Sequence, residues 1–227
     1  MPTRRGLLLG AGAALIMSRP ALAFAQTIVA APETPRLPSS GEIAFEIFRK
    51  GTRIGHHRLS FSGDGGDFQV AIDVEMVVKL GFIPVFRYEH RNVEHWQQGV
   101  FAGLEAKTNN DGDDLVTKVV RREDGYYVES TGKMPYVAPK GSHAATHWNI
   151  AQLNGPMINP QNGELLMPEI VKLGDEKVAL ADGKDVPATG YRLQMKDPLS
   201  LWYDGGEQWT ALDFTAGDGS TISYLKV

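Results

Sequence analysis

Alternation of apolar and polar residues is the dominant pattern of the chain between residues 41 and 227. In the clearest run, every second position from Phe68 to Val78 is apolar, and shorter runs of the same kind begin at Ile43 and Tyr191. Successive side chains of a strand point to opposite faces of a sheet, so this period predicts strands with one buried face.

Tight-turn dipeptides separate most of these runs. The seven positions are Asp64-Gly65, Asp111-Gly112, Asp124-Gly125, Asn162-Gly163, Asp182-Gly183, Asp204-Gly205 and Asp218-Gly219. Asp, Asn and Gly tolerate the positive φ angles that two-residue hairpin turns require. The spacing leaves no room for helical crossovers between parallel strands, and it therefore predicts an antiparallel meander.

One segment has the pattern of a helix. Ser142 is a candidate N-cap, Ala144, Trp148 and Ala151 form a narrow apolar stripe, and Asn154-Gly155 is a candidate end. This segment falls between two blocks of strands. We therefore expect a single all-β, mainly antiparallel domain over residues 41–227, a strongly curved sheet or half-barrel with one short helix packed on its concave face.

The N-terminal residues predict export. Residues 1–25 combine Arg4-Arg5 with a short apolar run and small residues before Ala25, which is typical of a cleaved twin-arginine signal peptide. A general secretory signal that carries two arginines is the alternative. Residues 26–40 are rich in proline and are expected to form a flexible leader. The expected location of the mature protein is the periplasm.

Composition and charge exclude further classes of function. The chain is 42% hydrophobic and 22% charged, as ordinary globular domains are, and it has no cysteine. Removal of residues 1–25, with three arginines and no acid, takes the net charge from −4 to −7. This charge argues against nucleic-acid binding. No later apolar run reaches the roughly 20 residues of a transmembrane helix.

The sequence carries no clear motif for a metal, a cofactor or a catalytic nucleophile. His143 and His147 would share a helix face as zinc ligands can, but no third ligand is evident. The acidic stretch 109–114 lacks the glycine and glutamate positions of an EF-hand loop, and we interpret it as a solvated turn. No nucleophile elbow or phosphate-binding loop is present in the sequence.

The segment from Tyr88 to Gln98 differs from the other strands because both of its faces carry polar residues. Such a strand lies at a wet edge of the sheet or lines a polar cavity, and we favour the edge. The preceding stretch, Leu80 to Phe86, is apolar and broken by Gly and Pro. It is a flap over a cavity, a docking patch or part of the core.

Several short motifs point to a known family. They are Glu94-x-Trp96-x-x-Gly99, Leu104, Thr146-x-Trp148-Asn149, Trp202-Tyr203-Asp204 and Asp218-Gly219-x-x-Ile222-x-Tyr224. Over about residues 41–227 the chain resembles an uncharacterised family of exported bacterial proteins, a domain of unknown function. That family is similar in strand pattern to half-barrel carriers such as the Lol-type lipoprotein carriers, whose curved sheet encloses an apolar cavity closed by helix. The resemblance implies a fold and supplies no catalytic residues; the single clear helix here is a departure from the carriers.

Two classes of function remain, with a third beside them. The first is an exported, soluble, non-enzymatic protein that binds an apolar small molecule or lipid-like chain on the curved sheet. The candidate binding residues are Phe82, Phe86, Tyr88, His90, Trp96, His147 and Trp148. The second is a periplasmic hydrolase-type enzyme with His90, Glu94 or His147 as acid-base groups. The third is a partner-binding module without a small ligand, which would present a flat apolar patch.

Overall fold

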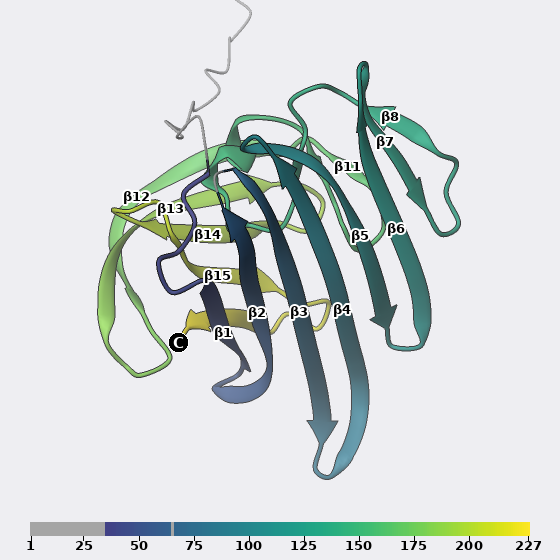
Figure 1. The fold of residues 1–227 in the computed structure, drawn as a ribbon. Helices are drawn as coiled ribbons and strands as arrows, with labels where there is room; N and C mark the ends of the chain where they lie inside the picture. Colours follow the sequence, from purple (N-terminus) through teal and green to yellow (C-terminus); the bar gives the residue numbers. More distant parts are fainter. Residues whose placement is uncertain (1–34, 65) are drawn as a thin grey trace, which may run out of the picture.

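The computed structural model describes residues 35–64 and 66–227, most of which lie in β-strands (Figure 1). The strands are β1 (Glu42–Arg49), β2 (Thr52–Asp64), β3 (Asp67–Leu80), β4 (Ile83–Gln97), β5 (Val100–Asn110), β6 (Asp113–Arg122), β7 (Gly125–Ser130), β8 (Tyr136–Ala138), β9 (His143–Ala144), β10 (Met157–Ile158), β11 (Leu165–Leu166), β12 (Glu169–Ala179), β13 (Asp185–Gln194), β14 (Leu199–Asp204), β15 (Trp209–Thr215) and β16 (Thr221–Lys226). The expected signal peptide, 1–25, and leader residues 26–34 lie outside the described residues.

Thirteen of these strands form one antiparallel sheet in the order β12-β13-β14-β15-β16-β1-β2-β3-β4-β5-β6-β7-β8. The first strand pairs with the last, Phe45 lying opposite Lys226 and Ile47 opposite Tyr224. The other strands extend from this central pair in both directions. Since β12 and β8 end the strand order, the sheet is not closed into a barrel. The expected all-β antiparallel fold is therefore confirmed.

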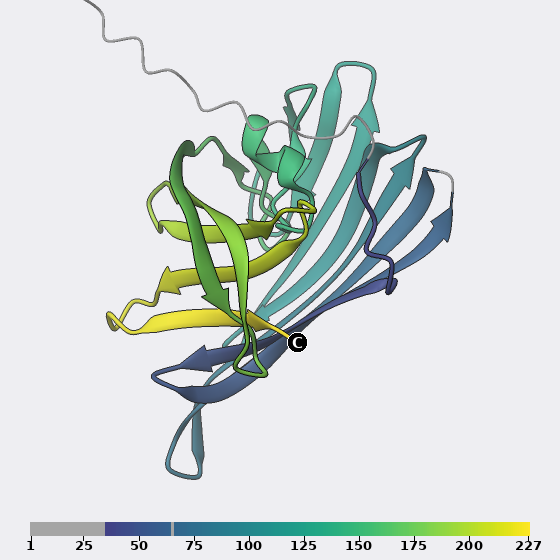
Figure 2. The same cartoon turned by 90° about the vertical axis from the view of Figure 1, so that its left-hand side faces the viewer.

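The sheet curves so that its two halves face each other across a shared core. Figure 2 shows the yellow-green strands β12–β16 opposite the long blue and teal strands, with the green connecting segment between them. Ring contacts join the halves: the centroid of Trp209 on β15 lies 4.2 Å from that of Phe45 on β1 and 5.2 Å from that of His57 on β2. The concave face is thus the buried face.

The turn dipeptides predicted from the sequence lie at the observed connections between strands. Six of the seven dipeptides lie wholly within the described residues, and each falls at a connection between consecutive strands. At the β5–β6 turn, Asp111 and Gly112 have φ angles of 53° and 102°. Both values lie in the region that this type of hairpin turn requires and that glycine, asparagine and aspartate tolerate best.

The expected helix is shorter than its pattern suggested. Within residues 142–155, only η1 (Ile150–Asn154), one stretch of 3-10 helix, is helical, and Asn149 rather than Ser142 caps it. The residues before η1 include β9, which pairs with β10 of a small inner sheet of order β11-β10-β9. The Ser142 hydroxyl instead donates to the Pro139 carbonyl. Tertiary contacts of this inner segment outweigh its weak helical stripe.

The interior connection formed by residues 139–168 fills the curve of the sheet. Trp148, Ile150 and Leu153 are buried, as are Met157 and Ile158 of β10. This arrangement agrees with the expectation that the segment around the short helix lies on the concave side. Within residues 35–64 and 66–227, no helix is long and apolar enough to cross a bilayer.

Candidate functional site

The inward face of β4 carries a row of aromatic and polar side chains. β4 pairs with β3 on one side and β5 on the other, so the interpretation of this segment as a wet edge is wrong. The buried residues of the row are Tyr88, His90, Asn92, Glu94 and Trp96. Glu89, Arg91 and His95, on the opposite face, are exposed. The polar row therefore faces the core of the curved sheet.

Glu94 lies within this row as a fully buried carboxyl group. The indole N–H groups of Trp96 and Trp148 donate to its Oε2 at 2.8 and 3.1 Å. The Thr146 hydroxyl bonds to its Oε1 at 2.6 Å. All three partners are neutral.

Burial raises the pKa of Glu94, and the hydrogen bonds from Thr146, Trp96 and Trp148 offset part of that rise. An indole only donates, so Oε2 must accept from both Trp side chains in either protonation state. A proton on Glu94 belongs on Oε1, where it can be donated to the Thr146 oxygen. The site thus accommodates a neutral carboxylic acid without losing a hydrogen bond.

His57 and Asn92 are buried polar groups without partners. Both ring nitrogens of His57, and both the nitrogen and the oxygen of the Asn92 side chain, make no hydrogen bond. The two residues flank β3 from opposite sides. His57 of β2 lies opposite Val74, and Asn92 of β4 lies opposite Ile72, two residues away on β3. Unsatisfied buried polar groups are rare and costly in folded proteins, so these two require an explanation.

Two further histidines accompany them. His90 bonds through Nδ1 to the Thr108 hydroxyl at 2.8 Å, and burial lowers its pKa to about 4. Burial also lowers the pKa of His147 to about 4, and the Nδ1 of this ring has no partner. The pKa of His57 lies well below its usual value, first because of burial and then because His147, His90 and His56 are near. All three interior imidazoles are therefore neutral at pH 7.

His147 is held in an unusual backbone conformation with φ of 71°. Its N–H donates to Oε1 of Gln152, and its carbonyl accepts from the Tyr203 hydroxyl at 2.8 Å. Gln152 also donates to that hydroxyl, at 2.9 Å. A left-handed conformation in a residue other than glycine is strained, and such strain is concentrated at functional sites.

Trp148 is part of an aromatic cluster beside Glu94. Its ring packs edge-on against Phe61, Phe68 and Trp96, with centroids 5.1, 6.1 and 5.3 Å away. Phe68 and Trp96 stack at 5.4 Å. The cluster joins β2, β3 and β4 to the interior connection.

The structure brings five of the seven candidate binding residues into the concave interior: Tyr88, His90, Trp96, His147 and Trp148. Phe86 packs at the margin of the core, and Phe82 is fully exposed at the tip of the β3–β4 hairpin. Phe82 is therefore not part of the interior set.

The candidate set omits His57, Asn92 and Thr146. The alternation places Asn92 on the same strand face as His90 and Glu94, and His57 on the same face as Leu59. The inward direction of both side chains could therefore have been predicted from the sequence. Thr146 stands in one of the family motifs, but no local pattern indicated its contact with Glu94, which spans 52 positions.

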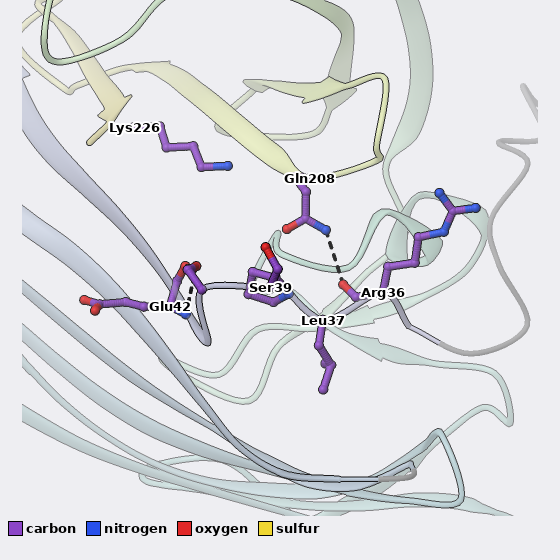
Figure 3. A pocket seen from close by; sticks show the side chains of 8 residues that line it. Arg36, Leu37, Ser39, Glu42, Gln208 and Lys226 are labelled. Atoms are coloured by element: carbon purple, nitrogen blue, oxygen red, sulfur yellow. Dashed lines mark hydrogen bonds between the residues drawn. The ribbon is translucent and has the colours of Figure 1, made fainter.

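A separate open pocket of about 370 Å³ lies where residues 36–42 pass β15 and β16 (Figure 3). Ser39 and Glu42 lie on one side of it, and Gln208 and Lys226 on the other; Gln208 donates to the Arg36 carbonyl. Burial lowers the pKa of Lys226. Within the described ranges, no group of three or more His, Cys, Asp or Glu could hold a metal ion.

A match to a family model over most of the chain identifies its family. A domain of unknown function, DUF6134, matches residues 45–227. The chain belongs to the DUF6134 family. The expectation of an uncharacterised family is thereby confirmed. No curated protein matches this DUF6134 chain.

A solved structure supports the fold of the DUF6134 protein. It is described as a beta-barrel-like protein of domain of unknown function DUF1849 from Brucella abortus. The similarity has a TM-score of 0.54 at 8% identity and covers 82% of this chain and 94% of that chain. At this identity the likeness concerns the fold alone.

Proposed function

We propose that this DUF6134 protein is an exported periplasmic protein that binds an apolar ligand or lipid-like chain inside the curve of its sheet. The polar end of the ligand would lie against His57 and Asn92. One observation carries the proposal: the side chains of both residues are buried and have no hydrogen-bond partner. A ligand group that donates and accepts hydrogen bonds would satisfy them, as binding sites commonly do with a few polar groups in an apolar lining.

The surroundings of His57 suit an apolar ligand body. The imidazole lies edge-on to Trp209 and Tyr224, at centroid distances of 5.2 and 5.7 Å, and 6.1 Å from Phe45. Burial keeps the imidazole neutral, so the matching ligand group is an uncharged donor or acceptor.

Native mass spectrometry of the protein purified from periplasm tests the proposal. We expect an additional mass on the wild-type protein, and its organic extract should identify the compound. The Asn92→Leu and His57→Leu variants should lose that mass. Each change replaces an unsatisfied polar group with an apolar one, so stability should be unchanged or higher. His95→Gln, on the exposed face of β4, is the matched control and should retain the compound.

A bare wild-type mass would contradict ligand binding, as would equal retention of the compound by all three variants. Loss of the compound together with strong destabilisation would instead show that His57 or Asn92 supports the fold. Urea unfolding of the same preparations distinguishes these results.

An acid-base enzyme using His90, Glu94 or His147 is less well supported by the geometry. The carboxyl oxygens of Glu94 contact two indoles and a hydroxyl, and His90 bonds to Thr108. A general acid or base must reach the proton it transfers, and Glu94 and His90 are occupied by these bonds within the core. Of the three candidates, His147 alone keeps a buried ring nitrogen, Nδ1, without a partner.

A further inference from the structure

The β3–β4 hairpin extends beyond the rest of the sheet as a two-stranded arm, residues 77–87 (Figure 1). Pairing of β2 with β3 reaches only Met76, and pairing of β4 with β5 begins at Tyr88. Beyond Arg87, which bonds to Asp111, the arm therefore pairs only with itself. Phe86 packs against the core at its root and anchors it there.

The tip of the arm is the most exposed apolar cluster of neighbouring residues in the described chain. Phe82 is 100% exposed, Leu80 75%, Ile83 68% and Val85 52%. Contiguous exposed apolar side chains are unfavourable in water and mark a surface that is covered by a partner. The interior site proposed above leaves this tip unused.

The charge of the arm identifies the kind of partner. Residues 77–87 include Lys79 and Arg87 and no acid, although the chain as a whole carries −4. Both side chains are exposed, and neither forms an ion pair with any of the described residues. The nearest acidic turn, at Asp111, lies at the root of the arm: its N–H donates to the Arg87 carbonyl at 2.8 Å. Negative charge is thus kept away from the apolar tip.

We propose that the β3–β4 arm inserts its tip into the surface of a lipid bilayer that contains anionic lipid. Leu80, Phe82 and Ile83 would enter the boundary between headgroups and acyl chains, while Lys79 and Arg87 contact the anionic headgroups. Apolar insertion and basic residues together give stable but reversible attachment to a membrane surface. The proposal does not depend on the interior site.

The backbone of the arm favours lipid over a second copy of the chain. Pro84 has no N–H to donate to a neighbouring strand, and the β3–β4 register shifts between Val78 and Lys79. Prolines and bulges are features that prevent edge strands from pairing with other strands.

Vesicle co-sedimentation of the full mature chain tests the proposal, with vesicles of phosphatidylcholine alone or mixed with phosphatidylglycerol. We expect binding to the mixed vesicles that weakens as salt is raised. The double variant Phe82→Ser, Ile83→Ser should bind at least about tenfold more weakly. Lys79→Gln and Arg87→Gln should each weaken binding about fivefold on mixed vesicles only. Met134→Ser, which removes a side chain that is 88% exposed elsewhere, is the control and should bind normally.

A Phe82→Trp variant gives an independent readout. Its fluorescence should be quenched by brominated lipid, whereas the wild-type protein, with Trp96, Trp148 and Trp209 buried, should show much less quenching. Absence of vesicle binding by the wild-type protein would overturn the proposal, and so would equal losses in the Met134 and tip variants. A concentration-dependent dimer that the tip variants abolish, with no vesicle binding, would assign the tip to a second copy. Because the tip is exposed, unchanged thermal melting should show that every variant is folded.

Discussion

The indole N–H of Trp148 donates to Oε2 of Glu94 at 3.1 Å, joining residues 54 positions apart in the sequence. Trp96 donates to the same oxygen at 2.8 Å, and Thr146 bonds to the other at 2.6 Å. Glu94 therefore fastens the interior connection to the middle of the sheet. This buried carboxyl group lies on the inward face of β4, two residues from Asn92 of the proposed site.

Glu94→Gln should leave stability at pH 7.5 unchanged within about 1 kcal/mol or raise it. The glutamine oxygen can accept from both indoles while its amide donates to Thr146, and no buried charge is left. Glu94→Leu should instead cost about 3 kcal/mol or more, because two N–H groups and a hydroxyl lose their partner. Urea unfolding of the two variants beside wild type measures the difference. Equal losses in both would show that the hydrogen bonds of Glu94 do not matter.

Trp148→Ala should lower the free energy of unfolding by about 3–5 kcal/mol, the range for removal of a large buried aromatic. The ring is 3% exposed and contacts Phe61, Phe68 and Trp96, so its loss leaves a cavity beside Glu94. Trp202→Ala, a half-buried indole whose N–H bonds to Glu176, is the comparison and should cost less. A loss below about 1 kcal/mol with unchanged binding of an apolar fluorescent probe would contradict a role in core or site.

Stability should fall as the pH drops from 7.5 to 5.5. The folded-state pKa values of His57, His90 and His147 are lowered, so these residues take up protons in the unfolded chain first. Their contribution is present above the unfolded value near 6.5 and is lost below it, by roughly 1 kcal/mol for each of His90 and His147 over this range. His57→Leu should reduce the loss in urea melts at the two pH values. An unchanged pH dependence would show that His57 is accessible to protons in the folded state.

Glu94 acts in the opposite direction. Its pKa is raised on folding, so its contribution to stability is greatest below the unfolded value of about 4.5 and is lost as the pH rises through the folded value. Glu94→Gln removes this opposing effect, and the loss of stability toward pH 5.5 should become steeper than in wild type. The same pair of urea melts measures it, and a shallower dependence would contradict a raised pKa.

Replacement of Arg4 and Arg5 together by Lys should leave precursor in the cytoplasm if export uses the twin-arginine route. The basis is the arginine pair before a weakly apolar run. Cell fractionation with an immunoblot for the precursor and mature forms measures the result. Unchanged secretion would favour the general secretory route and would leave export itself intact.

Local sequence determined the antiparallel fold and the inward face of its strands. The signals were the alternation of apolar residues, as from Phe68 to Val78, and the hairpin dipeptides. Both are local because strand period and turn conformation depend on neighbouring residues. The sequence also placed His90 and Trp96 on one face of their strand. It did not show whether that face was wet or buried. Only the position of β4 between β3 and β5 decided this.

The predicted helix is a second feature that the local sequence pattern did not determine. The stripe of Ala144, Trp148 and Ala151 is weak, and β9 pairing and the bond from Trp148 to Glu94 determine the conformation instead. The tertiary structure likewise decided that His57 and Asn92 have no hydrogen-bond partners. Whether a buried polar atom has a partner depends on residues that the fold brings together from distant parts of the chain. Local pattern therefore determined the strands and their faces, and long-range packing determined the chemistry within the curve.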